Sequence, residues 1–370
     1  MTASDVIGID ASRLTRTPRT GTETYTFELL SALGRLAPPV AIELYLNASA
    51  PPADLPLVGQ AVCMPFPRFW THFRLSAAMA RRRPGVLFVP ARVIPIVHPP
   101  TVVTIHDVGY LHVPDAHRSR DRRRLDWTTR WSVRAAARVI AISETTKADL
   151  VAAYTVDPSR VVVIPHGVGA AFHPATPEEI ARVRDRHGLN APYLLGVGTI
   201  QPRKNLGRQA IAMNRVKSAG LPHELVLAGN RGWMPGEVER EIAESGAAER
   251  VRILGYVDDR DLPALYSGAE LLSFPSLYEG FGLPMLEAMA CGLPVVASAS
   301  SSLPEVAGDA AILVDPTSAD AIGSAYLRIL QDPVLAADLS RRGAERAKLF
   351  PWDRTAAETL AVLREVRDGA

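Results

Sequence analysis

Short runs of apolar, β-branched residues alternate with longer amphipathic stretches from one end of the chain to the other. This alternation predicts parallel strands joined by helical crossovers. In the first half, six runs are expected to form one sheet: Val6–Ala11, Ile42–Leu46, Val86–Pro90, Thr101–His106, Arg138–Ser143 and Val161–Pro165. In the second half, a second sheet is expected from "YLLGVG", which starts at Tyr193, followed by "ELVLAG", "RVRILG", "AELLSFPS", "LPVVAS" and "AAILVD".

The length of 370 residues favours at least two domains. The polar segment "FHPATPEEIARVRDRHGLNAP" separates the two series of strands, and its Pro177 stands where a helix would begin. We therefore expect an N-terminal domain over residues 1–180, a C-terminal domain over 181–350, and a last helix over 351–370 that packs back toward the N-terminal domain. The predicted fold class is α/β, with two Rossmann-like, doubly wound parallel sheets facing a central cleft.

Composition places the chain among folded globular proteins, since 47% of its residues are hydrophobic and 22% are charged. Its two cysteines, Cys63 and Cys291, are far apart, which argues against a disulfide framework and against a zinc site and suits a reducing cytosol. The sequence shows no signal peptide, and no run reaches the roughly 18 apolar residues of a membrane span. We expect a cytoplasmic protein.

Charge is distributed unevenly along the chain. Residues 1–185 carry 22 Lys and Arg against 16 Asp and Glu, and the remainder carries 19 against 23. This asymmetry is too mild for a nucleic-acid-binding protein, but it would allow the first half to lie against anionic lipid or a phosphorylated substrate. Arginine outnumbers lysine 37 to 4, so a lysine is the more informative cation in this chain.

The segment "AELLSFPSLYEGFGLPMLEAMACGLPVVAS" carries the clearest chemistry. A buried strand leads into a loop with Glu279, and a helix that contains Glu287 follows. Gly280 and Gly282 let the backbone approach a ligand closely, and the start of the helix offers unpaired N–H groups and the positive end of its dipole. This pattern predicts an anion site. Because the two carboxylates beside it could hold the hydroxyl groups of a sugar and of a ribose, a sugar nucleotide is the expected ligand.

A second cluster is "GVGTIQPRKNLGRQAI", in which a strand ends at Gly198 and a loop carries Arg203 and Lys204. Asn205 is expected to cap the helix that follows. Two cations at a helix start would neutralise a departing diphosphate and so replace a metal ion.

The first half offers two further candidate segments at strand ends. "DASRLTRTPRTGTETYTFELL" predicts a strand, a polar loop that contains Gly21, and a helix. "VVTIHDVG" places His106 and Asp107 at the end of another strand, with Asp107 expected to be held in a turn. Both segments lie at the sheet edge where a ligand is expected.

At these residues the chain resembles the retaining glycosyltransferases of family 4, which have the two-Rossmann GT-B fold. The resemblance covers nearly the whole chain and is carried by "TIHDVG", "AISETTKADL", "VVVIPHGV", "GTIQPRKNL", "LVLAG", "LGYVDDRDLPALYSGAELLSFPSLYEGFGLPMLEAMACGLPVV" and "SLPEVAGDAAILVDP". Many members have an Arg directly after the strand, in a "GR" pair, where this chain has Gly198 and Thr199. Arg203 would then have to supply that charge.

The resemblance implies a role for each matching residue. Glu279 matches the glutamate that contacts the donor sugar near the reacting carbon, and Glu287 matches the one that holds the ribose. Arg203 and Lys204 match the basic pair on the diphosphate, and His106 matches the histidine near the reacting sugar and the acceptor. Further candidates for donor binding are Gly21, Val257, Gly280, Phe281, Gly282 and Leu283. The N-terminal domain would then bind the acceptor and the C-terminal domain the nucleotide sugar.

The function implied is metal-independent, retaining transfer of a hexose to a hydroxyl of a carbohydrate or lipid-linked acceptor. Mannose from GDP-mannose is the favoured donor, and a UDP-sugar such as UDP-glucose stays open. So do an epimerase or phosphorylase of the same fold and an inactive sugar-nucleotide-binding regulatory subunit. A nicotinamide dehydrogenase is disfavoured because "GVGTIQ" lacks the third glycine of the dinucleotide fingerprint. The carboxylates of "DRD" at residues 259–261 resemble a metal site, but we interpret them as a helix N-cap.

The segment "RFWTHFRLSAAMARRRP" allows two interpretations. Trp70, Phe73, Ala77 and Ala80 have helical spacing and could form the core-facing side of a surface helix. Alternatively, these residues and the arginines among them, Arg68, Arg74 and Arg81 to Arg83, could contact anionic lipid. The arginines of "HRSRDRRRLDWTTRWSVR" would extend such a face. This second interpretation predicts a peripheral position at the inner face of the cytoplasmic membrane.

Overall fold

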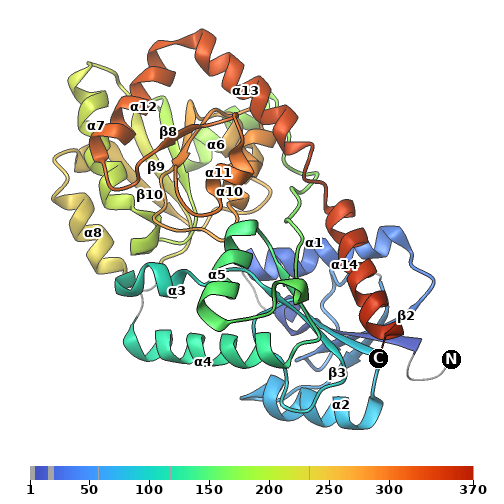
Figure 1. Cartoon of the computed structure of the whole chain (residues 1–370). Helices are drawn as coiled ribbons and strands as arrows, with labels where there is room; N and C mark the ends of the chain where they lie inside the picture. Colours follow the sequence, from blue (N-terminus) through green and yellow to red (C-terminus); the bar gives the residue numbers. More distant parts are fainter. Residues whose placement is uncertain (1–4, 16–20, 57, 117, 233, 370) are drawn as a thin grey trace. The chain divides into compact units, whose positions relative to one another are not determined.

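A computed structural model describes residues 5–15, 21–56, 58–116, 118–232 and 234–369 of the chain (Figure 1). The described residues form two compact units. Unit 1 takes its residues from 5–111, 118–167 and 351–369, and unit 2 takes its residues from 112–116 and 168–350. The chain thus passes into unit 2 after Gly167, whereas the sequence analysis placed the boundary after residue 180.

Unit 1 is built on a parallel sheet of seven described strands in the order β3-β2-β1-β4-β5-β6-β7. The strands are β1 (Val6–Asp10), β2 (Ala41–Leu46), β3 (Gln60–Cys63), β4 (Val86–Val89), β5 (Thr101–Ile105), β6 (Arg138–Ala141) and β7 (Val161–Val163). Six of them were predicted. Strand β3 was missed because it is an edge strand of only four residues without a fully buried side chain, and its sequence "QAVC" is too short to give a clear signal.

The helices before residue 168 are η2 (Ser12–Thr15), α1 (Gly21–Leu36), η3 (Thr71–Leu75), α2 (Ser76–Arg82), α3 (Gly109–His112), η4 (Pro114–Ala116), α4 (Ser119–Ala135), α5 (Glu144–Tyr154) and η5 (Pro158–Arg160), of which η4 belongs to unit 2. The last helix, α14 (Trp352–Asp368), also belongs to unit 1. Its Trp352 and Leu363 are buried in the same core as Ile9 and Leu29. The hydroxyl of Thr355 donates to the carbonyl oxygen of Pro165 at 2.8 Å.

Unit 2 contains six described strands in the order β10-β9-β8-β11-β12-β13, all parallel. They are β8 (Tyr193–Val197), β9 (Glu224–Ala228), β10 (Val251–Gly255), β11 (Leu271–Phe274), β12 (Val295–Ser298) and β13 (Ile312–Val314). All six were predicted at these places in the sequence. Together with unit 1, they confirm the prediction of two parallel α/β sheets.

The helices of unit 2 begin with α6 (Pro177–His187), which has a complete capping box between Thr176 and Glu179. The others are η6 (Pro202–Lys204), α7 (Leu206–Ser218), α8 (Pro235–Ala243), η7 (Ala248–Arg250), α9 (Leu262–Ser267), α10 (Leu283–Ala290), α11 (Leu303–Ala307), α12 (Ala319–Gln331) and α13 (Pro333–Ala347). No helix of the described residues is both long and apolar enough to cross a lipid bilayer.

One predicted helix face is wrong. Trp70 is buried and its indole N–H donates to the carbonyl oxygen of Met64 at 2.7 Å, whereas Phe73 is exposed. The cause is local geometry, because η3 is a π-helical turn and its wider spacing rotates the following residues relative to an ordinary α-helix. Trp70, Phe73, Ala77 and Ala80 therefore do not share one buried side.

Candidate active site

The residues singled out in the second half of the sequence lie where loops leave two neighbouring strands of unit 2. Strands β8 and β11 are paired and parallel, and the strand order reverses between them. The loop after β8 carries Arg203 and Lys204, and the loop after β11 carries Glu279. Ligands of doubly wound sheets bind at the carboxyl ends of the strands at such a reversal. This point of unit 2 is therefore the candidate active site.

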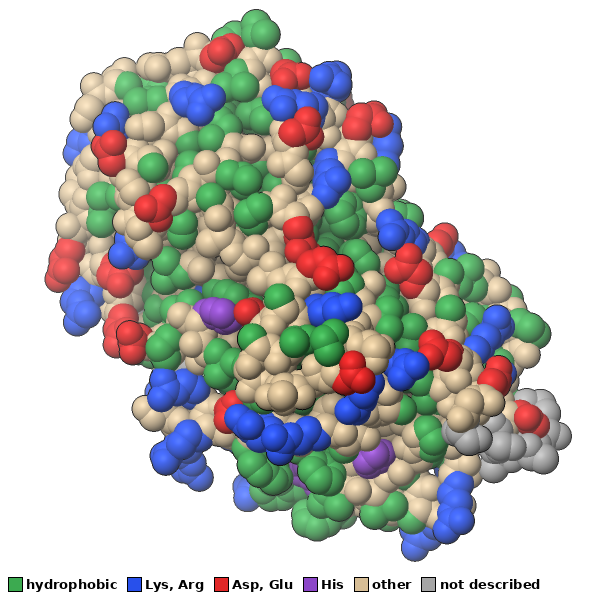
Figure 2. Space-filling view, viewed as in Figure 1, with side chains coloured by type: hydrophobic (Ala, Val, Ile, Leu, Met, Phe, Trp, Pro, Cys, Tyr) green, Lys and Arg blue, Asp and Glu red, His purple; other side chains and the backbone are tan. Residues whose placement is uncertain are grey.

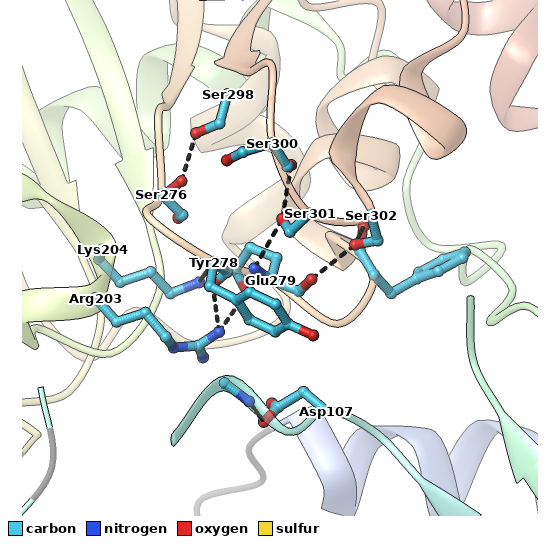
Figure 3. Close-up of polar contacts among 12 residues, drawn as sticks. Asp107, Arg203, Lys204, Ser276, Tyr278, Glu279, Ser298, Ser300, Ser301 and Ser302 are labelled. Carbon is cyan, nitrogen blue, oxygen red and sulfur yellow. Dashed lines mark hydrogen bonds and ion pairs between the residues drawn. The ribbon is translucent and has the colours of Figure 1, made fainter. Parts of the chain in front are cut away.

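The side chains of Lys204 and Arg203 lie side by side and both extend toward Glu279, as Figure 3 shows. Lys204 Nζ is 2.7 Å from Glu279 Oε1, and Arg203 Nη1 is 3.2 Å from Glu279 Oε2. The three side chains expose only 9–14% of their surface. The Lys204 ammonium group also lies 4.7 Å from the centre of the Phe274 ring. Two positive charges facing one carboxylate leave these three groups with a net positive charge.

The electrostatic balance at Glu279 favours the ionised carboxylate. Burial would raise its pKa, but the charges of Arg203 and Lys204 outweigh burial and lower the pKa below its ordinary value. Glu279 is therefore negatively charged at neutral pH, and its charge depends on the two cations.

Hydrogen bonds fix the backbone around Glu279 from several sides (Figure 3). Arg203 Nη1 donates to the carbonyl oxygen of Tyr278 at 2.6 Å. The hydroxyl of Ser302 donates to the carbonyl oxygen of Glu279 at 2.9 Å, and the N–H of Glu279 donates to the hydroxyl of Ser301 at 3.1 Å. The sequence analysis missed these serines. Their signal is the run "SASSS", which begins with the last residue of β12, because strand β12 pairs with β11 and its end lies at the same edge of the sheet.

Asn205 has a different role from the predicted one. It stands at the N-cap position of α7, but its side chain makes no capping hydrogen bond and its backbone is left-handed, with φ of 59°. Its side-chain amide instead donates to the carbonyl oxygens of Pro275 and Pro316, at 2.9 and 2.7 Å. Asn205 therefore links the loop of Arg203 and Lys204 to the loop of Glu279.

The glycines before α10 permit the tight path that the sequence suggested. Gly282 has φ of 111°, and a Cβ placed on it would lie 2.6 Å from Leu303 Cδ2, so a larger residue would be strained and crowded. Leu283 then begins the helix. The side chain of Phe281 is buried and lies edge-on to Phe350, with ring centres 5.8 Å apart. Phe281 can thus offer a ligand its backbone only, as can Gly280.

Glu287 lies further along α10 and is half-buried. The hydroxyl of the buried Tyr266 donates to Glu287 Oε2 at 2.8 Å, which fixes the carboxylate. Val257 follows strand β10 and is buried. A carboxylate only accepts hydrogen bonds, so Glu287 places acceptor oxygens at this point of α10, in an orientation that Tyr266 holds.

Arginines bond Asp261 of "DRD" and Asp258, which precedes it. Asp261 occupies the N-cap position of α9, as predicted, but its side chain makes no cap hydrogen bond. It is buried and bonds Arg186. Asp258 accepts from Arg260 at 3.0 Å, and this hydrogen bond lowers the pKa of Asp258 to about 2. Within the described residues, no three His, Cys, Asp or Glu side chains are grouped so that they could hold a metal ion.

In unit 1, His106 follows β5, and its Nε2–H donates to the carbonyl oxygen of Pro90 at 2.9 Å. A carbonyl oxygen only accepts, so Nε2 carries the proton and Nδ1 of the neutral ring keeps its lone pair. Burial lowers the pKa of His106 to about 4, although the bond to Pro90 opposes this. His106 is therefore uncharged at pH 7. The carboxylate of Asp107 accepts from the N–H of Gly109 at 3.0 Å, which confirms that Asp107 is held in a turn.

His106 belongs to a cluster of rings that the sequence analysis did not find. Tyr25 lies 4.8 Å from His106 and 4.7 Å from His166, and Trp352 of α14 lies 5.8 Å from His166, measured between ring centres. His166 is buried, and burial lowers its pKa well below the ordinary value. The only sequence signal was a histidine placed between a strand end and Gly167.

Gly21 is the first residue of α1, and it is exposed. A Cβ placed on it would meet no other atom within 4 Å. Most of the polar loop before it, residues 16–20, lies outside the described residues. Gly21 and His106 are thus carried by unit 1, whereas the other predicted site residues belong to unit 2.

Comparison with known protein families gives two matches that follow one another along the chain. Residues 19–172 match the model of "Glycosyltransferase Family 4", and residues 177–346 match that of "Glycosyl transferases group 1". The second match contains Arg203, Lys204, Glu279 and Glu287.

Curated relatives include several glycosyltransferases. O-antigen chain mannosyltransferase B of Escherichia coli is 35% identical over 263 residues, which are 70% of this chain and 68% of the relative. D-inositol 3-phosphate glycosyltransferase of Salinispora tropica is 34% identical over 63% of this chain and 52% of the relative. The serotype-specific mannosyltransferase WbdA of Escherichia coli is 31% identical over 59% of this chain, but this match spans only 27% of that longer protein.

Solved structures share the fold over nearly the full length. Sucrose-phosphate synthase from Thermosynechococcus elongatus matches with a TM-score of 0.78 and 22% identity, covering 99% of this chain and 100% of that one. WaaG, a glycosyltransferase involved in lipopolysaccharide biosynthesis, matches with a TM-score of 0.75 and 17% identity, covering 97% and 99%. With the two consecutive domain matches and the mannosyltransferase relative, these findings show that the chain belongs to family 4 of the glycosyltransferases and carries the group 1 glycosyltransferase domain in its second half.

Proposed function

We propose that the protein is a retaining hexosyltransferase that needs no metal ion. It moves mannose from GDP-mannose to a hydroxyl group of a carbohydrate or lipid-linked acceptor. The observation that carries this proposal is the arrangement of Lys204, Arg203 and Glu279 at the strand reversal of unit 2. A carboxylate held by two cations suits a donor that combines a sugar, whose reacting carbon becomes positive, with a diphosphate that leaves as an anion.

Each group of the proposed donor has a partner in unit 2. The net positive charge of Lys204, Arg203 and Glu279, together with the backbone N–H groups at the start of α10, suits a diphosphate. Glu287, held by Tyr266, would accept hydrogen bonds from the ribose hydroxyls. Glu279 would lie beside the donor sugar.

The proposed reaction proceeds on one face of the sugar. The bond between the anomeric carbon and the phosphate oxygen breaks, and the nucleoside diphosphate leaves with the electron pair. The acceptor oxygen bonds the anomeric carbon from the same side, and its proton passes to the departing phosphate. Lys204 and Arg203 would stabilise the negative charge on the leaving group, and Glu279 the positive charge on the sugar. His106, neutral at pH 7, would border the acceptor as a hydrogen-bonding group rather than as a cation.

The donor assignment rests on the relatives. The two Escherichia coli relatives named above are mannosyltransferases by name. So is a further relative, an α-(1→4)-mannosyltransferase from Mycolicibacterium hassiacum, which is 33% identical over 60% of this chain. UDP-glucose remains the second candidate donor, because a structural neighbour from Anabaena was solved in complex with it, at 19% identity and a TM-score of 0.74.

A donor panel with product analysis tests this proposal. Purified protein is incubated with GDP-mannose or UDP-glucose and a soluble mannoside acceptor, and the one-bond coupling between the anomeric carbon and its proton in the product is read by NMR. We expect transfer from GDP-mannose with the α-configuration retained. An inverted product would contradict the retaining mechanism, and transfer from UDP-glucose alone would replace the donor.

Chelation tests the absence of a metal requirement. Because Lys204, Arg203 and the helix start provide the positive charge, turnover should be unchanged after dialysis against EDTA. Loss of activity that manganese restores would contradict this expectation and would favour a metal site at Asp259 and Asp261. An Asp259→Asn variant would then test this metal site, since it should alter the manganese dependence only if Asp259 binds the metal ion.

A further inference from the structure

Unit 1 carries a group of large apolar side chains on its surface. This group, called the apolar patch below, consists of Phe69, Phe73, Ile96, Val97, Trp127 and Trp131. Phe69 exposes 69% of its surface and Trp127 exposes 64%. Single exposed apolar residues are ordinary, but a group of this size marks an interaction surface.

Hydrogen bonds connect the segments that carry the apolar patch. The hydroxyl of Ser76, the first residue of α2, accepts from the N–H groups of Ile96 and Val97, at 3.0 and 3.3 Å. The hydroxyl of Ser132 on α4 accepts from the N–H of Ile94 at 3.3 Å. The loop with Ile96 and Val97 is thus held between α4 and the junction of η3 with α2, so all three parts of the apolar patch lie in one region.

Phe69 is exposed at a strained backbone position. Its φ of 55° is left-handed, a conformation that bulky residues rarely adopt. Its ring packs edge-on against Phe73, with ring centres 6.3 Å apart, rather than into the core. The carbonyl oxygen of Phe69 accepts from the N–H groups of His72 and Phe73, so its backbone opens the helical turn, but the exposed ring adds nothing to the core and is better explained by binding.

The charge around the apolar patch is strongly positive. Residues 66–134 contain thirteen Arg and four Asp, with no Lys and no Glu, although the whole chain has a net charge of only +2. On α4, the spacing of three or four residues puts the tryptophans and several arginines on one face: Arg120, Arg123, Trp127, Trp131 and Arg134. Figure 2 shows hydrophobic side chains gathered along the margin of unit 1 below α4, with Lys or Arg side chains beside them.

We propose that the apolar patch docks onto an anionic lipid bilayer. The aromatic side chains would enter the interfacial region, and the arginines of α4 would meet the phosphate headgroups. Exposed aromatic rings bordered by arginines complement a bilayer, whose headgroups are negatively charged at the surface and whose interior is apolar. The sequence analysis expected Arg81 to Arg83 at such a contact, but Arg82 is paired with Glu43 at 2.8 Å. This inference goes beyond the proposed function and does not depend on the donor.

Sedimentation with vesicles tests the docking. The full chain is mixed with vesicles of phosphatidylcholine alone or with about a third phosphatidylglycerol. We expect binding to the anionic vesicles that weakens as salt rises, because exposed charges are screened over roughly 8 Å at physiological ionic strength. Trp127→Ser combined with Trp131→Ser should reduce the partition coefficient about tenfold or more. Turnover of a water-soluble acceptor should be unchanged.

Matched controls keep this test sharp. Val334→Ser and Arg328→Gln alter an exposed apolar residue and an exposed arginine of unit 2, and both should bind vesicles like the parent. Phe69→Gly should weaken binding but leave Tm unchanged or higher, because glycine tolerates the left-handed backbone. A purely structural role for Phe69 predicts a lower Tm instead.

Four outcomes would overturn the proposal. The first is absence of binding to anionic vesicles, and the second is loss of binding in the unit 2 controls equal to that in the tryptophan variant. The third is a concentration-dependent dimer, seen by light scattering without lipid, that the tryptophan substitutions dissociate, because this would assign the apolar patch to a second copy of the chain. Binding to duplex RNA or DNA as tight as to the vesicles would likewise exclude a lipid-specific surface.

Discussion

Replacing Glu279 with Gln should lower kcat by about 10²- to 10³-fold while the protein stays folded. The amide keeps the shape of the side chain but removes the negative charge that would stabilise the positive sugar in the transition state. Affinity for GDP should stay equal or increase, because Lys204 and Arg203 no longer share their charge with the carboxylate. Turnover kinetics and isothermal titration with GDP measure both effects on the same sample.

A variant at the surface tests whether the loss of any carboxylate, wherever it lies, has the same effect. Glu345→Gln changes an exposed residue of α13 that is paired with Lys348, and its kinetics and GDP affinity should equal those of the parent. Thermal melting of both variants verifies the fold. A Glu279→Gln variant as fast as the parent, or one that loses GDP binding together with turnover, would contradict the role of Glu279 at the sugar.

The sheets could be predicted because their central strands are buried on both faces. A strand such as "ELVLA" at Glu224–Ala228 has to be apolar throughout its buried part, and that requirement is visible in the sequence alone. Strand β3 at the edge is under no such requirement, and it was missed. Burial thus explains both the predicted strands and the missed one.

The site was predicted where backbone requirements and charge coincide. Gly282 needs a left-handed backbone close to Leu303, and Lys204 is one of only four lysines, so each leaves a clear signal in the sequence. The structure brings Lys204, Arg203 and Glu279 together, although 75 residues separate Lys204 from Glu279. Their roles toward a donor remain predictions, which the variants proposed above would test.

Side chains that bind across the fold could not be predicted, because their partners are distant in sequence. Asn205 resembles a helix cap, but its amide binds the carbonyl oxygen of Pro316, 111 residues away. Asp261 has a cap position, but its carboxylate bonds Arg186, 75 residues away. In both cases a local rule gave the position correctly, and a long-range contact determined what the side chain does.

Lys204→Met should lower kcat/KM by about 10²- to 10³-fold, which corresponds to loss of about 3–4 kcal/mol of transition-state stabilisation. Methionine preserves most of the volume that packs on Phe274 but removes the charge from the proposed diphosphate site. Lys217→Met is the matched control, because Lys217 is an exposed lysine of α7 that is paired with Glu249. This control should retain parental kinetics, and parental kinetics in Lys204→Met would exclude Lys204 from the reaction.

The same variant should change the pH dependence in a defined direction. In the parent, Arg203 and Lys204 lower the pKa of Glu279, so its charge and the stability that it contributes persist above the ordinary carboxylate range and are lost only as the pH falls through the lowered pKa. Without Lys204, burial still raises the pKa of Glu279, while Arg203 is the one cation of the pair left to lower it, so this pKa must rise. The acid limb of kcat/KM in Lys204→Met should therefore move to higher pH. In the Lys204→Met, Glu279→Gln double variant this limb should disappear, and the two losses should not add, because each residue acts through the other. An acid limb at the parental pH in Lys204→Met would show that Glu279 is not the group that titrates.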